Sequence, residues 1–253
     1  MARKIQGYGW NADMPDGRDL MYAAPPEVVT ALPPRVDLRS ECPEVYDQGQ
    51  LGSYTANAIG AVLEFDQMKQ KEQAFAPSRL FIYYNERVIE GTVNSDSGAQ
   101  IRDGVKTVNQ QGAPPETDWA YDITKFADKP PQPAYDDATQ HQAILYPRLT
   151  PTLAQLKGCL ASGYPFVFGF VAYESFESQE VASTGAVPLP KSGEKQLGGH
   201  AVLAVGYDED QQRFTVRNSW GPNWGMAGYF TLPYPYLLQG TLSHDFWTIR
   251  SVK

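Results

Sequence analysis

A change in hydrophobic periodicity divides the sequence into two parts. From residue 53 to about residue 71, apolar side chains recur at spacings of three and four, which is the period of an amphipathic helix. After residue 165 this pattern gives way to short apolar runs that are rich in β-branched and aromatic residues. Helices that precede the strands, rather than alternating with them, predict an α+β fold with a helical half and a β half.

The same patterns give approximate bounds for the elements. Residues 122–150 are polar and proline-rich, and they are predicted to form an irregular crossover between the halves. Residues 1–32, punctuated by proline and glycine, are predicted to form an extended strap without packed elements. Helices are predicted over residues 53–71, 78–88, 101–110 and 152–161, and strands over residues 166–171, 201–207, 213–217, 229–232 and 246–249, with a hairpin at residues 208–212.

The charge of the chain argues against several classes of partner. Its 253 residues contain 21 Lys and Arg against 29 Asp and Glu, which gives a net charge of −8. An acidic chain without a basic run is not expected to bind nucleic acid or an anionic membrane, and no apolar stretch approaches the length of a membrane span. The first residues lack the apolar run of a signal peptide, so we expect a cytoplasmic protein unless a leader has been removed. The oligomeric state is left open.

Neither a metal site nor a cofactor is predicted. The three histidines, His141, His200 and His244, have no Cys or His neighbour at the spacing of a zinc site. Phosphate-loop and dinucleotide-binding glycine motifs are absent from the sequence. The two cysteines, Cys42 and Cys159, are expected to be separate buried thiols, with one disulfide between them as the alternative.

Three separated segments carry candidate chemistry. Residues 48–58 form a glycine-rich turn that leads into a helix, residues 198–201 contain His200 at the opening of a predicted strand, and residues 218–225 begin with Asn218 at the end of the next strand. Neighbouring antiparallel strands place such a His and Asn side by side, and the Asn amide oxygen then holds one imidazole N–H. A lone His at a strand start is more often structural, but its Asn partner favours a functional interpretation.

Together these segments resemble the papain family of cysteine peptidases, in which a His and an Asn follow the nucleophile by roughly 130–150 residues. Counted from Tyr54, His200 lies 146 residues and Asn218 lies 164 residues further along the chain. Residues 32–39 resemble the start of that family's mature domain, residues 96–99 its substrate-binding glycine stretch, and residues 223–230 the strand that follows the Asn motif. The resemblance covers about residues 32 to 232.

This resemblance implies a papain-like two-lobe fold, in which a helical half faces an antiparallel, β-barrel-like half across a cleft. It places a peptidase domain at residues 32–253, with a helical lobe at about residues 48–120 and a β lobe at about residues 160–253. Residues 1–31 then form a propeptide-like N-terminal strap. The partner that this fold implies is a peptide or protein held in the cleft.

One departure from the family pattern decides the functional interpretation. The family's nucleophile is a cysteine at the start of the central helix, and Tyr54 occupies that position here, while Leu51 stands at the family's preceding cysteine. Neither Cys42 nor Cys159 is in register with the nucleophile. A phenol ionises near pH 10, compared with about 8.5 for a thiol, and its oxygen lies at the far end of a rigid ring. Ser53 is expected to cap the helix rather than to replace the nucleophile, so the chain is predicted to be proteolytically inactive.

The resemblance implies that the other catalytic positions are intact. Gln48, six residues before Tyr54, stands where the family has the side chain of its oxyanion hole. His200 is the implied general base and acid, and Asn218 is the residue that orients it. Trp220 is expected to cover the His–Asn hydrogen bond, with an ordinary core aromatic as the alternative.

Four further residues are implied to bind a peptide. Ser97 and Gly98 are expected to pair through their backbones with an extended ligand, although Gly98 could serve only a turn. The small residues Gly198 and Ala201 are expected to line a side-chain pocket.

Three functions fit this sequence. The first is a papain-like peptidase that has lost its nucleophile and with it peptide hydrolysis. The second is a non-catalytic module that binds peptides or proteins in the same cleft, with Tyr54 as a contact surface. The third is a self-blocked protein in which residues 1–31 lie in the groove.

Overall fold

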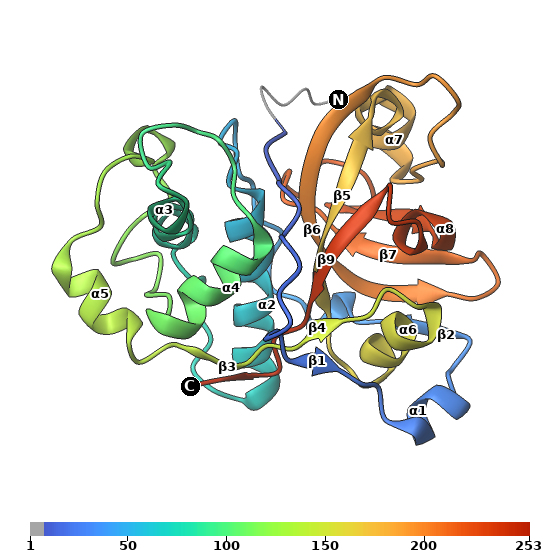
Figure 1. The fold of residues 1–253 in the computed structure, drawn as a ribbon, viewed down its shortest axis with the longest axis horizontal. Helices are drawn as coiled ribbons and strands as arrows, with labels where there is room; N and C mark the ends of the chain where they lie inside the picture. The colour runs from blue at the N-terminus through green and yellow to red at the C-terminus, as the bar shows by residue number, and fades with distance from the viewer. Residues whose placement is uncertain (1–7) are drawn as a thin grey trace.

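The computed structural model describes residues 8–253, and its helices and strands are segregated as the sequence predicts (Figure 1). The helical lobe contains α2 (Tyr54–Gln70), α3 (Arg79–Glu90), α4 (Ile101–Gln110) and α5 (Gln132–Ala138). The other helical segments are α1 (Pro26–Thr30), α6 (Leu153–Ala161), α7 (Gln179–Thr184) and α8 (Tyr234–Leu238), with the 3-10 turns η1 (Arg39–Glu41), η2 (Ile123–Lys125) and η3 (Glu174–Glu177).

The second lobe is built on one sheet. Its strands follow the order β1-β4-β9-β5-β6-β7-β8, and β2 pairs with β6 on the side of this path. All pairings in the sheet are antiparallel except that of β1 with β4. The strands are β1 (Met21–Tyr22), β2 (Arg35–Asp37), β4 (Arg148–Leu149), β5 (Phe166–Tyr173), β6 (Gln196–Asp208), β7 (Arg213–Arg217), β8 (Tyr229–Pro233) and β9 (Ser243–Trp247), with β3 (Ala143–Leu145) and β10 (Ser251–Val252) as a separate pair.

The expected barrel-like half is therefore an open sheet. In the part of the chain that the structure describes, the terminal strands β1 and β8 of the sheet order do not pair with each other. The α+β class and the division into a helical lobe and a sheet lobe are confirmed.

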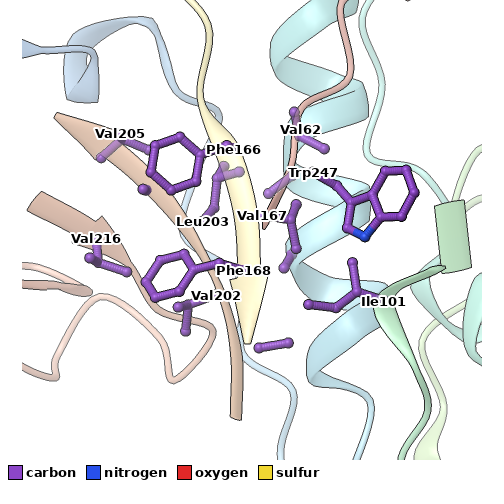
Figure 2. Close-up of a cluster of buried hydrophobic side chains, with 14 of the residues drawn as sticks. Val62, Ile101, Phe166, Val167, Phe168, Val202, Leu203, Val205, Val216 and Trp247 are labelled. Atoms are coloured by element: carbon purple, nitrogen blue, oxygen red, sulfur yellow. The ribbon is translucent and has the colours of Figure 1, made fainter. Parts of the chain in front are cut away.

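Helix α2 lies between the lobes and is buried along nearly its whole length. Small residues such as Ala56, Ala58 and Ala61 allow the strands to approach it closely. Figure 2 shows the alternation along β5, where Val167 points toward Val62 of α2 while Phe166 and Phe168 point to the opposite face. Burial of each such side chain contributes about 1.5–3 kcal/mol, so this packing fixes the position of the first turn of α2.

Most predicted elements are found close to their expected bounds, but four predictions are wrong in detail. The crossover at residues 122–150 contains α5, β3 and β4. The strap contains β1 and α1, since β1 adds to the sheet beside β4 and a proline suits the first turn of α1. The strand predicted over residues 246–249 is β9, which spans Ser243–Trp247. The fourth error concerns the strand of His200.

Strand β6 begins at Gln196, so His200 lies inside the strand and does not open it. The sequence predicts a strand boundary at Gly198 and Gly199 because glycine weakens a strand. They stay in the sheet here by pairing with Ala172 and Val171 of β5.

Neither a disulfide nor a cluster of metal-ligating side chains is found among residues 8–253. Cys42 and Cys159 are free thiols, half-buried and buried respectively. Residues 8–253 contain no group of three His, Cys, Asp or Glu residues placed to hold a metal ion. Within the same residues, no helix has both the length and the apolar character needed to cross a bilayer.

Asp66 is a buried carboxyl group on α2. Its side chain is 1% exposed, and neither of its oxygens has a hydrogen-bond partner among the described residues. Burial raises the pKa of Asp66 to about 8, although the positive charges of Arg250 and Lys69 act in the opposite direction.

We expect Asp66→Asn to stabilise the chain at neutral pH and not in acid. Between about pH 4 and 8, the folded chain keeps a proton on Asp66 that the unfolded chain has lost, so the stability of the parent falls as pH rises through this window. Asn does not ionise. The free energy of unfolding of the variant should therefore exceed that of the parent by roughly 2–4 kcal/mol at pH 7 and should be similar to it near pH 4. Urea unfolding at several pH values measures the difference. Asp118→Asn, at an exposed position, is the control, and a difference that does not vary with pH contradicts the prediction.

Candidate active site

The first turn of α2 presents Tyr54 at the junction of the two lobes. Tyr54 is the first residue of the helix, and its side chain is 1% exposed. Ser53 occupies the N-cap position, but its hydroxyl does not cap the helix and instead bonds the hydroxyl of Tyr121 and accepts from the Asn57 amide at 3.0 Å. The predicted capping role of Ser53 is therefore wrong, because these side chains compete for its hydroxyl.

His200 and Asn218 come together across β6 and the end of β7. His200 Nε2 lies 2.9 Å from Asn218 Oδ1, and both residues are buried. An amide oxygen can only accept, so this contact places the proton on Nε2 and leaves Nδ1 as the basic nitrogen. Asn218 Oδ1 also accepts the backbone N–H of Ser219 at 2.9 Å, which fixes the orientation of the amide.

Aromatic side chains surround the imidazole of His200. The ring of Tyr54 lies edge-on at a centroid distance of 5.2 Å, and Trp220 lies on the imidazole at 5.4 Å with an angle of 30° between the planes. Phe170 and Phe176 lie at 5.6 and 6.0 Å. Trp220 therefore lies over the His–Asn pair, and its function as a cover of this hydrogen bond stays a prediction.

Gln48 is held rigidly beside the start of α2. Its amide oxygen accepts the hydroxyl of Ser219 at 2.6 Å, and its amide nitrogen donates to the carbonyl of Leu51 at 2.9 Å. An amide nitrogen carries two hydrogens, so the bond to Leu51 uses one of them. The side chain is fully buried, and its function as an oxyanion donor stays a prediction.

The N-terminal strap crosses this site. Figure 1 shows the segment after the grey trace running between the helical lobe and the sheet toward β1. The backbone N–H of Gly9 donates to the hydroxyl of Tyr54, and the N–H of Trp10 donates to the carbonyl of Gly199 at 3.1 Å. The space expected to hold an extended peptide therefore contains residues 8–10 of the chain itself.

The predicted peptide-binding residues lie along the strap. A Cβ added to Gly9 would lie 2.5 Å from the carbonyl oxygen of Ser97, and one added to Gly98 would lie 2.3 Å from that of Gly9. Likewise, a Cβ added to Gly198 would lie 2.5 Å from the Cβ of Tyr8. The N–H of Gly98 donates to the hydroxyl of Tyr83 at 3.2 Å, so it is not the group that pairs with the strap.

The expected side-chain pocket is occupied by Trp10 and has partly different walls. A Cβ on Gly169 would lie 2.0 Å from the Trp10 ring, and one on Gly199 would lie 2.5 Å from it. Ala201 is buried in β6 and pairs with Gly169 across the sheet. Sequence reasoning missed Gly169 because a single glycine within an apolar strand carries no sign of the side chain that approaches it.

Asp96 opens the predicted substrate-binding stretch, but the sequence analysis gave its side chain no role. Its carboxylate accepts the N–H of Gly52 at 2.9 Å and the hydroxyl of Tyr83, which in turn accepts the N–H of Gly98. This chain of hydrogen bonds ties the turn before Tyr54 to the glycine stretch that faces the strap.

The state of Tyr54 limits the chemistry of the site. Burial raises the pKa of its phenol well above the usual value, and the charge of Asp96 adds to this effect, while the N–H of Gly9 acts against it. At neutral pH the group is therefore a protonated phenol, which is a poor nucleophile for acyl transfer. The geometry combines a positioned imidazole with a hydrogen-bonding phenol.

The sequence of the chain matches that of a known enzyme family over most of its length. The family described as "Papain family cysteine protease" matches residues 32–235. The chain belongs to the papain family of cysteine proteases. Membership implies a cleft that binds peptide substrates between the two lobes.

Individual proteins agree with this assignment. The papain-family chain is 42% identical to an uncharacterised peptidase C1-like protein of Acanthamoeba polyphaga mimivirus, over 98% of this chain and 88% of that protein. The crystal structure of xylellain, a cysteine protease from Xylella fastidiosa, matches with a TM-score of 0.92 and 44% identity, over 100% of this chain and 99% of that chain. The procathepsin B S9 structure from Trypanosoma congolense, at a TM-score of 0.74 and 17% identity over 96% of this chain and 87% of that chain, shows the fold alone.

An ionic cluster anchors the strap of this papain-family chain below the site. Asp13 accepts the N–H of Arg102 on α4 at 3.1 Å and the indole N–H of Trp247 on β9 at 3.0 Å, and its own N–H donates to Asp245 at 2.8 Å. Arg148 of β4 pairs with Asp245 at 2.7 Å. The carboxylate of Asp13 thus binds the strap to both lobes, and Asp19 adds ion pairs to Arg102 of α4 and to Arg148 of β4.

Substitution Asp13→Ala should loosen the strap. It leaves the indole N–H of Trp247 and the N–H of Arg102 without their acceptor, which costs about 2–3 kcal/mol of unfolding free energy. Hydrogen exchange at the amide of Trp10 should become faster, because this amide bonds to Gly199 only while the strap is in place. Asp16→Ala is the control, since among residues 8–253 the carboxylate of Asp16 pairs with the exposed Arg18. Unchanged exchange at Trp10 in the Asp13 variant would show that the cluster does not hold the strap.

Proposed function

We propose that this papain-family chain does not hydrolyse peptides, because Tyr54 stands where the family carries its nucleophilic cysteine. The observation that carries the proposal is the position of Tyr54, at the first residue of α2 with its ring 5.2 Å from that of His200. A thiolate at a helix N-terminus is stabilised by the helix dipole and a neighbouring imidazolium. A buried, protonated phenol gains nothing comparable from them.

The function that remains is binding of an extended peptide. The support comes from the hydroxyl of Tyr54, which accepts a backbone N–H from Gly9. This hydrogen bond makes the phenol a contact for a peptide backbone at the point where an active relative would attack a carbonyl. The cleft then acts as a receptor that holds a peptide without cutting it.

Tyr54→Cys tests the proposed cause of inactivity. The variant should gain thiol-dependent cleavage of an unfolded protein substrate, because the His200–Asn218 pair and Gln48 are already in place. Loss of a nucleophile costs about a millionfold in kcat in a serine protease, so we expect a gain of at least about a thousandfold over the parent. Cleavage of a quenched fluorescent protein substrate measures it.

Two further variants keep this test decisive. Tyr54→Cys combined with His200→Ala should be inert, which separates catalysis from contamination. Tyr54→Cys combined with Gly9→Ala, in which the strap is displaced by a steric clash, covers the case in which the strap blocks access. Efficient cleavage by the unmodified chain refutes the proposal. A folded Tyr54→Cys, Gly9→Ala variant that neither cleaves substrate nor reacts with a thiol alkylator refutes it as well.

A further inference from the structure

The strap is held by side chains as well as by its backbone, and the contacts differ at each position. We propose that the cleft is selective for extended peptides of the sequence Tyr-Gly-Trp-x-x-Asp, and that residues 8–13 are a built-in example of this ligand. The proposal rests on the proposed function, since it names the class of peptide that the receptor would take. Each of the four defined positions meets a different constraint.

The glycine position is set by steric exclusion. A Cβ at Gly9 would lie 2.5 Å from the carbonyl oxygen and 2.9 Å from the carbonyl carbon of Ser97, and 3.1 Å from the Cα of Gly98. These are backbone atoms, held by the hydrogen bond from Gly98 to Tyr83. Any side chain at this position of a ligand must therefore push the two backbones apart. The same approach lets the N–H of Gly9 reach the hydroxyl of Tyr54.

The tryptophan position is set by a space that lacks side chains. The indole of Trp10 lies where Cβ atoms on Gly169 and Gly199 would otherwise be, and it is 7% exposed. The imidazole of His244 stacks on the indole at a centroid distance of 6.2 Å and an angle of 29°. Two glycines on neighbouring strands thus form a flat slot, and a broad aromatic ring fills such a slot better than an aliphatic side chain does.

The tyrosine position combines a ring contact with a hydrogen bond. The hydroxyl of Tyr8 donates to Glu177 at 2.8 Å. Its ring meets the imidazole of His200 edge-on at 6.1 Å, and its Cβ lies against Gly198. A phenylalanine would keep the ring contact and lose the bond to the carboxylate, so tyrosine should be preferred over it.

The aspartate position, three residues after the tryptophan, is set by donors from both lobes. The carboxylate of Asp13 accepts from the N–H of Arg102 and the indole of Trp247, and its side chain is fully buried beside Arg148. Asparagine has only one accepting oxygen and cannot satisfy both donors with the same geometry. The two intervening residues, Asn11 and Ala12, are exposed, so their identity should matter little.

The test uses the full chain with Gly9→Ala, whose added methyl group should displace its own strap and open the cleft. A synthetic peptide with the sequence of residues 8–14, blocked at both ends, should bind this variant at least tenfold more tightly than it binds the parent. Gly17→Ala is the matched control, because a Cβ there meets no atom within 4 Å, and this variant should behave like the parent. Isothermal titration measures binding, and hydrogen exchange at residue 10 reports whether the strap has left.

Variant peptides then test each position. Replacing Gly by Ala, Trp by Ala or Asp by Ala in the peptide should weaken binding at least tenfold, and replacing Tyr by Phe should weaken it a few-fold. Equal binding of the parent peptide and these variants would overturn the proposed selectivity while leaving a general peptide receptor in place. A Gly9→Ala chain whose strap stays in the cleft would overturn the steric argument. If the variant fails to fold, Trp10→Ala opens the cleft by removing the indole, and the same outcomes apply.

These outcomes are independent of catalysis. Cleavage of protein substrates by the unmodified chain would contradict the proposed inactivity and leave the selectivity for the peptide untouched. Failure of the peptide to bind an open cleft would overturn the selectivity and leave the inactivity untouched.

Discussion

The contact between a phenol and a backbone N–H at the start of α2 is the interaction on which the site depends. Tyr54 reaches Gly9 because α2 is held between the lobes by packing on all sides. That packing fixes the first turn, and the turn fixes the distance to His200 on β6. The phenol of Tyr54 is thereby held against the backbone of the strap.

Retention of the His200–Asn218 pair beside a phenol has a physical explanation in the surrounding packing. The pair lies within a layer of aromatic rings that includes Trp220 and Phe176. Removing the imidazole would take one hydrogen bond from Asn218 Oδ1 and leave a cavity among these rings, so the pair contributes to the stability of the fold. Packing alone therefore gives a reason for the His200–Asn218 pair to be present beside a phenol.

Much of this architecture could be predicted from the sequence, and the errors have identifiable causes. Helices such as α4 carry a clear period and a terminal signal, so their bounds were predicted closely. His200 and Asn218 were placed together because antiparallel neighbours bring strand ends into contact, although β6 extends further than expected. The sequence does not predict strand at Gly198 and Gly199, because glycine has a low strand propensity. These glycines allow the strap to approach β6 closely, and local propensity carries no information about such a tertiary contact. Asp96 was overlooked because its hydrogen bonds connect segments distant in sequence.

The strap bridges the two lobes, since the carboxylate of Asp13 bonds to α4 on one side and to β9 on the other. Thermodynamic reciprocity then applies to the width of the groove. Any ligand or mutation that separates the lobes weakens the binding of the strap. Release of the strap must in turn lower the free-energy cost of separating the lobes. Occupancy of the groove by the strap and the separation of α4 from β9 are thus coupled, and a probe attached to either reports on the other.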